Sequence, residues 1–128
     1  MTPVGRASAE RGAATLWAAA LMAVLLLVGL ACLAIAQQAL TRQRAATAAD
    51  LAAIAGAQAL DDPCARARAY AERNGAELVE CDAHVVADGP DVYVTVRMPA
   101  PPLVVHLLDL LGGNARPILV QAYAGPPA

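Results

Sequence analysis

The longest feature in the hydrophobic pattern is an uninterrupted apolar run near the start of the chain. Residues 13–36, AATLWAAALMAVLLLVGLACLAIA, contain no charged side chain over 24 positions. A helix of this length would be about 36 Å long, which exceeds the roughly 30 Å of a bilayer's hydrocarbon core. Trp17 lies near one end of the run, where an aromatic anchor at the membrane interface belongs. The run therefore predicts one transmembrane helix.

The helical pattern continues beyond the apolar run. Residues 37–60 contain no proline and are rich in alanine, the best helix former, so we expect one helix from about residue 10 to residue 60. Small residues recur on it at steps of three and four and let helix backbones approach closely. They predict a helix-packing face made of Ala45, Ala49, Ala52 and Gly56. The alternative is that a bias toward GC-rich codons has raised the alanine content.

The rest of the chain changes its hydrophobic period and predicts a small domain. Asp62 and Pro63 are typical of a helix start, and Asn74-Gly75 of a helix end. Alternation of apolar and polar residues follows on both sides of Asp88-Gly89-Pro90, which is typical of a hairpin. On its first strand the alternation places Val79, Cys81, Ala83 and Val85 on one buried face. We expect a helix over 64–73, strands over 79–85 and 92–98, a helix over 103–111 and a strand over 118–124.

These elements predict an α+β protein, in which a long N-terminal transmembrane helix continues into a small pilin-like α-β-β-α-β outer domain. The predicted organisation is a cytoplasmic stub at 1–12, a transmembrane helix at 13–36, a helical extension at 37–60, an outer domain at 61–124 and a tail at 125–128.

Two cysteines lie in the predicted outer domain. Cys64 and Cys81 both fall on apolar faces of their elements, as a bridge between a helix and a strand requires. A domain of this size seldom buries enough apolar surface to be secure without such a staple. If the domain is extracytoplasmic we favour a disulfide, and the alternative is two free buried thiols.

Charge indicates an orientation across the membrane. Residues 1–60 carry a net charge of +2 and residues 61–128 a net charge of −4. Arginine lies on both sides of the apolar run, so the number of positive residues next to the run does not decide which end is cytoplasmic. The difference between the two parts favours a single-pass membrane protein with a cytoplasmic N-terminus and an extracytoplasmic C-terminal domain.

Composition excludes several functions. All nine basic residues are arginine and the only serine is Ser8, so a P-loop lysine, a Schiff base and a serine hydrolase are not expected. A net charge of −2 argues against nucleic acid. Cys81-x-x-His84 is half of a zinc motif with no second pair, and His106 with Asp109 reads as a polar stripe on a helix. We expect no enzyme activity and no small-molecule substrate, and we assign no catalytic residue, cofactor or metal ligand.

Several segments resemble one family. They are RGAATLWAAALMAV at 11–24, RAATAADLAAIAGAQAL at 44–60, PCARARAYAERNGAELVEC at 63–81 and DVYVTVRMPA at 91–100. Together they resemble the TadE-like proteins of Flp/Tad pilus systems, and more narrowly the actinobacterial branch named for a helicase/secretion gene neighbourhood. The resemblance implies a pseudopilin or assembly component that packs with other pilin-like or Tad-system membrane proteins, or with itself.

The same resemblance implies processing by a prepilin peptidase after a glycine. Gly12 matches that glycine, which predicts cleavage between Gly12 and Ala13. The family pattern has a glutamate at the fifth mature position, where this chain has Trp17. Two alternatives stay open: a non-polymerising single-pass envelope anchor, and a small secreted binding domain released by cleavage after Ala36.

Overall fold

The computed structural model describes residues 6–86 and 89–125, with side chains from residue 12 onward except that of Val86. Residues 1–5 of the predicted stub, Asp88 of the predicted turn and residues 126–128 of the predicted tail lie outside these ranges. The chain forms two compact units, Met1–Ala36 and Gln37–Ala128, which we call unit 1 and unit 2.

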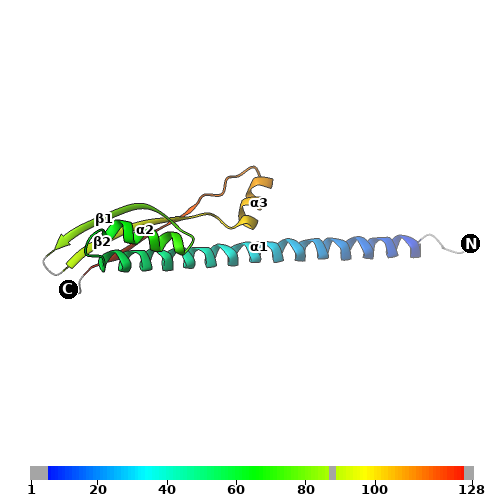
Figure 1. Ribbon diagram of the computed structural model, residues 1–128. Helices are drawn as coiled ribbons and strands as arrows, with labels where there is room; N and C mark the ends of the chain where they lie inside the picture. Colours follow the sequence, from blue (N-terminus) through cyan, green and yellow to red (C-terminus); the bar gives the residue numbers. More distant parts are fainter. Residues whose placement is uncertain (1–5, 87–88, 126–128) are drawn as a thin grey trace, which may run out of the picture. The chain divides into compact units, whose positions relative to one another are not determined.

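Helix α1 (Arg6–Ala57) provides the helical part of unit 1 and the first element of unit 2 (Figure 1). Unit 2 continues with α2 (Pro63–Arg73), β1 (Glu77–Val86), β2 (Gly89–Met98), α3 (Pro102–Leu110) and β3 (Ile118–Ala124). The predicted α+β class is confirmed, as is the α-β-β-α-β order after the long helix.

Local sequence explains both ends of α2. The Asp62 side chain accepts a hydrogen bond from the Ala65 amide at 2.9 Å, and Pro63 occupies the first turn, where no amide donor is needed. At the other end the chain turns through Gly75, whose φ of 73° lies in the left-handed region that glycine adopts without strain. These caps hold α2 to eleven residues.

The sheet is an antiparallel meander in the order β1-β2-β3. Strand β2 is central, and α3 lies in the connection between β2 and β3. The inward side chains of β2 alternate with outward ones, and Val92, Val94 and Val96 are almost fully buried. One face of the sheet therefore carries the core.

Small residues on two helices complete this core. Ala45, Ala48, Ala49, Ala52 and Ala53 of α1 and Ala67 and Ala71 of α2 all have 0% exposure. They form one cluster with the β2 valines, Met98 and Ile118. Alanine side chains hold the helix backbones close to the sheet, so a few valines suffice to fill the space between them. The segment predicted as a separate helical extension is thus packed into the domain from Ala45 onward.

The predicted inward position of Val79 is wrong. The register shifts between the pairs Leu78–Val96 and Glu80–Thr95, which marks a β-bulge. A bulge adds one residue to a strand and changes the face on which the preceding side chains lie. Leu78 therefore packs against the core, and Val79 is 47% exposed.

The predicted burial of Val85 is wrong as well, since its side chain is 89% exposed. The reason is that α1 ends before it reaches the part of the sheet that contains Val85. Gly56, in the last turn of α1, lies against Val92, whose partner on β1 is Ala83. Val85 pairs with Pro90, one inward position farther along the hairpin, where α1 no longer covers the sheet.

Candidate functional site

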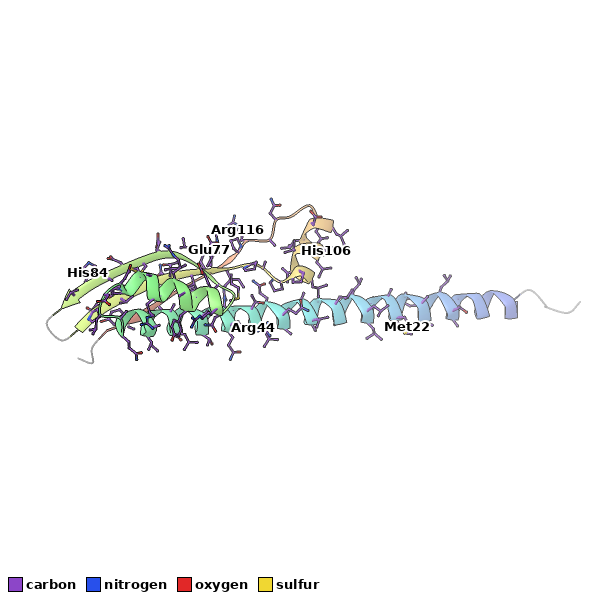
Figure 2. All side chains as sticks on the ribbon, in the orientation of Figure 1. Met22, Arg44, Glu77, His84, His106 and Arg116 are labelled. Carbon is purple, nitrogen blue, oxygen red and sulfur yellow. A yellow bond between two sulfur atoms is a disulfide. The ribbon has the colours of Figure 1, made fainter. Side chains whose placement is uncertain are left out.

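The first half of α1 presents apolar side chains that the protein does not cover. Trp17 is 74% exposed, and the large aliphatic side chains from Leu16 to Leu33 are exposed with it; Met22 is labelled on this segment in Figure 2. In the described part of the chain, one helix is long and apolar enough to cross a membrane, within Gly12–Ala57. A continuous apolar surface of this size needs an apolar environment, which a bilayer or neighbouring helices provide.

The predicted processing site lies at the start of this helix. Gly12 and Ala13 belong to α1 and are exposed, and a Cβ built on Gly12 would meet no atom within 4 Å. The side chain at the fifth position after this junction is that of Trp17, which extends from the helix as an exposed aromatic group. Cleavage after Gly12 stays a prediction.

The predicted helix-packing face lies inside unit 2. Ala45, Ala49 and Ala52 have 0% exposure and Gly56 is buried. A Cβ on Gly56 would stand 3.0 Å from the Pro63 carbonyl oxygen, 3.1 Å from Val92 Cγ1 and 3.4 Å from Ala67 Cβ. The close approach that small residues permit is therefore made with the domain's own α2 and β2.

A different side of α1 remains open in unit 2. Leu40, Leu51 and Ile54 are each at least 40% exposed. Their spacing of eleven and three residues places them on one side of the helix. This side, rather than the alanine face, is the one that another helix can reach.

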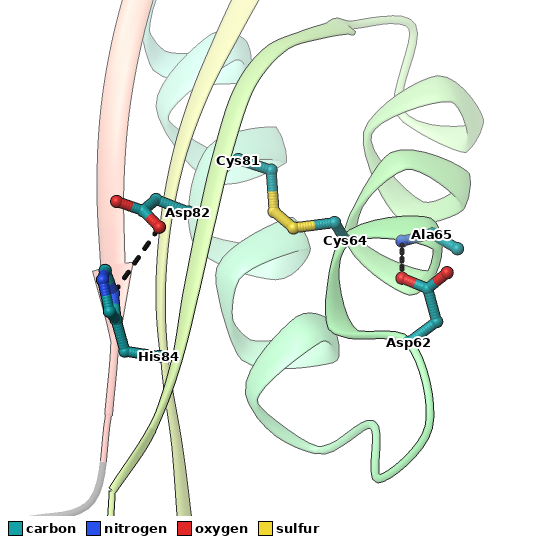
Figure 3. Close-up of a disulfide and its surroundings, with 6 residues drawn as sticks. All are labelled: Asp62, Cys64, Ala65, Cys81, Asp82 and His84. Carbon is teal, nitrogen blue, oxygen red and sulfur yellow. Dashed lines mark hydrogen bonds and ion pairs between the residues drawn. A yellow bond between two sulfur atoms is a disulfide. The ribbon is translucent and has the colours of Figure 1, made fainter.

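Cys64 and Cys81 are joined in a disulfide, with their Cα atoms 5.8 Å apart. Cys64 stands in the first turn of α2, which the Asp62 cap orients, and Cys81 points inward from β1 opposite Val94 (Figure 3). The bridge ties α2 to the edge strand β1. Cys32, the third cysteine, is free and exposed on α1.

The outer face of the sheet carries polar and aromatic pairs across its strands. The rings of Tyr93 and Tyr123 lie 4.6 Å apart, and the Tyr123 hydroxyl donates a hydrogen bond to Asp91 Oδ1 at 3.0 Å. That hydrogen bond, followed by partial desolvation and the Asp91 charge, raises the pKa of Tyr123. Farther along, Arg97 donates to Glu77 Oε2 with its Nη2 at 2.6 Å. The two tyrosine side chains are exposed, whereas Glu77 and Arg97 line an open hollow of about 600 Å³ next to the end of α2.

The residues considered for metal or acid–base chemistry do not assemble into a site. His84 and Asp82 point away from the disulfide, with 3.6 Å between His84 Nδ1 and Asp82 Oδ1, and Cys81 is oxidised (Figure 3). His106, which is labelled in Figure 2, lies on α3 and is exposed, and Asp109 on the same helix is exposed as well. Within residues 12–85 and 89–125, no group of three or more His, Cys, Asp and Glu side chains could hold a metal ion.

Sequence reasoning missed two surfaces. The tyrosine pair requires the β2–β3 register, in which Tyr93 faces Tyr123; the outward alternation of both strands was the available signal. The other is α3, in which Leu110 is exposed while Leu103, Val104, Leu107 and Leu108 are partly buried; its run of leucine and valine is equally compatible with a fully buried helix.

Residues 12–59 match the model of a family described as "Putative Flp pilus-assembly TadE/G-like". Neither a curated protein nor a solved structure matches the chain. The matched segment contains the apolar half of α1 and the half that is packed into unit 2. The resemblance to TadE-like proteins is thereby confirmed for this segment, and it relates the chain to Tad pilus assembly.

Proposed function

We propose that this TadE-like protein is a pilin-like structural subunit or assembly component of a Tad-type pilus or secretion system. The observation that carries the proposal is the TadE/G-like match over residues 12–59, on a helix that joins an apolar segment to a small disulfide-linked domain. The structural rather than catalytic role in this proposal rests on the matched family, which is described by pilus assembly. The functional parts are then the surfaces through which the protein contacts lipid and other subunits.

In this proposal α1 crosses the cell membrane once, with the N-terminus in the cytoplasm and unit 2 outside. The net charge of +2 on residues 1–60 and −4 on residues 61–128 supports this orientation. The Cys64–Cys81 disulfide supports it independently, because disulfides persist mainly in oxidising compartments.

The partners are other pilin-like or Tad-system membrane proteins, including further copies of this chain. Two surfaces are available to them: the apolar side chains before Ala36, and the side of α1 formed by Leu40, Leu51 and Ile54. In lipid, helices associate through close packing, because lipid tails already solvate apolar side chains. The alanine face of α1 is filled by the domain itself and is assigned no partner.

Two observations favour specific alternatives. Trp17 stands where the family pattern has a glutamate, which favours a non-polymerising membrane anchor. The boundary between the two units falls between Ala36 and Gln37, so cleavage after Ala36 would release unit 2 whole. This coincidence favours a small secreted binding domain.

The N-terminus of the native protein separates the three functions. Mass spectrometry of the protein purified from its own membranes is expected to give Ala13 as the first residue for a processed pilin. An intact stub indicates the anchor, and Gln37 indicates release. Gly12→Leu is expected to block the processing, whereas Gly29→Leu, farther along the same helix, leaves it unchanged.

The orientation has its own test. Peptide mapping without reduction is expected to recover Cys64 and Cys81 in one linked pair. If both thiols of the native protein alkylate without reduction, the extracytoplasmic location of unit 2 is wrong.

A further inference from the structure

The strands of unit 2 carry an excess of acid on the outer face of the sheet. With histidine counted as neutral, their net charge is −3, from Glu77, Glu80, Asp82, Asp91 and Arg97. Asp82 and His84 point away from the disulfide that joins β1 to α2 (Figure 3). Glu80 accepts a hydrogen bond from the Thr95 hydroxyl, which lies on the same face as the exposed Tyr93 ring. The face that no helix of the core covers is therefore acidic.

The two helices on the other face of the sheet carry an excess of arginine. In α2 and the part of α1 that belongs to unit 2, the net charge is +3, from Arg42, Arg44, Asp50, Arg66, Arg68, Glu72 and Arg73. Asp61 and Asp62 lie in the loop between these helices, where Asp62 caps α2. Within residues 12–85 and 89–125, none of the five arginines takes part in an ion pair. Figure 2 shows Arg44 on the helical side of unit 2, and Glu77 and His84 on the sheet side.

Both faces also present exposed apolar side chains. On the sheet, Val79 and Leu119 are 47% and 59% exposed and line an open hollow of about 500 Å³. On α1, Leu51 and Ile54 are 40% and 48% exposed. Three strands about 4.8 Å apart and about 25 Å long present several hundred Å² of surface, which is the size of a weak interface. Such an interface forms where copies of a protein are held at high local concentration, as in one membrane.

We propose that unit 2 of one copy docks, through the outer face of its sheet, on the helical face of unit 2 in a second copy. The net charges of −3 and +3 attract, whereas sheet against sheet or helices against helices would bring like charges together. The two copies use different surfaces, so the contact is heterologous and repeats from copy to copy. This inference rests on the proposed subunit function and names the surfaces through which unit 2 would assemble.

Cysteine crosslinking in membranes tests which faces meet. Two versions of the full chain are produced in the same membrane, both with Cys32→Ala so that one added cysteine is the only free thiol. One version carries Gln121→Cys on the outer face of the sheet and the other Thr47→Cys on the open side of α1, and both positions are exposed. A lipid-permeant bismaleimide links nearby thiols, and tags of different size identify the mixed product. Leu26→Cys, on the exposed apolar part of α1, reports contact between copies elsewhere.

The mixed product of residues 47 and 121 is expected to exceed either same-position product several-fold. Predominant 121–121 or 47–47 products would mean that like faces meet, which overturns the proposal. Crosslinks at residue 26 without the mixed product would overturn the docking of unit 2 and leave the subunit function intact. No product at any of the three positions would overturn both.

Charge reversal tests why these faces meet. Arg73→Glu on the chain with the thiol at residue 47 is expected to lower the mixed product several-fold, because it removes positive charge from the helical face. Asp82→Arg on the other chain is expected to restore the product. Arg116→Glu is the matched control, since Arg116 is exposed but lies before β3, outside both helices. An unchanged yield with Arg73→Glu, or an equal loss with Arg116→Glu, would overturn the pairing of the acidic face with the arginine-rich one.

Discussion

Gly56 lies so close to Val92 that a Cβ on the glycine would stand 3.1 Å from the valine Cγ1. This approach packs the last turn of α1 against the central strand of the sheet. The Pro63 carbonyl oxygen lies close to the same position, 3.0 Å from a Cβ built on Gly56. The alanine-rich half of α1 is consequently a structural layer of unit 2. Its small residues set the distance between helix and sheet.

The first prediction concerns the distance between α1 and the sheet. Gly56→Leu and Ala52→Leu are expected to destabilise unit 2 by about 1–3 kcal/mol or more, because added methylene groups have no space in a packed core. Leucine forms helices at least as well as glycine and nearly as well as alanine, so loss of helix propensity does not explain the effect. Hydrogen exchange of the β2 amides in the full chain measures it. Gln43→Leu, at an exposed position of the same helix, is the control. Unchanged β2 protection in both core variants would contradict the packing of α1 on β2.

The second prediction concerns the domain boundary. A fragment that begins at Gln37 is expected to fold with native β-sheet chemical shifts. A fragment that begins at Asp61 is expected to stay unfolded, because it lacks the five fully buried alanines of α1. Two-dimensional NMR of both fragments, with the disulfide formed, distinguishes the cases. A folded 61–128 fragment would show that α1 is dispensable for the core.

The third prediction concerns the β-bulge. Leu78→Asp is expected to cost several kcal/mol, because it places an unpaired charge against the core, whereas Val79→Asp points to solvent and costs little. Urea denaturation of the two variants measures the difference. The opposite ranking would mean that β1 continues without a bulge and that Val79 faces inward.

The fourth prediction concerns pH. The hydrogen bond to Asp91, above all, raises the pKa of Tyr123 in the folded protein. Stability from this interaction is therefore fully present below the ordinary tyrosine pKa of about 10 and is lost as the pH rises through the folded pKa. NMR titration of the Tyr123 ring is expected to show a lower pKa in Asp91→Ala than in the unchanged protein. An identical pKa in the two proteins would exclude the hydrogen bond as the cause.

The sequence by itself determined the elements whose signals are local. The apolar run of 13–36 predicts a segment that needs an apolar environment, because no other segment is large enough to bury it, and the family match includes the same residues. The Asp62 cap, Pro63 and Gly75 bound α2 through interactions within a few residues. Alternation around the Asp-Gly turn predicts β1 and β2, because a strand with one buried face has a period of two.

The tertiary structure alone decided what each face meets. The sequence predicts a close helix contact at four small residues, Ala45, Ala49, Ala52 and Gly56. A small side chain can pack against another subunit's helix as well as against the chain's own sheet, so the sequence does not identify the partner. The bulge at Val79 depends on the register with β2, so strict alternation along β1 could not reveal it. The run of leucine and valine in α3 is the same whether the helix is covered or bare. These outcomes depend on contacts between residues far apart in the chain, and the local pattern of hydrophobic and polar positions contains no information about them.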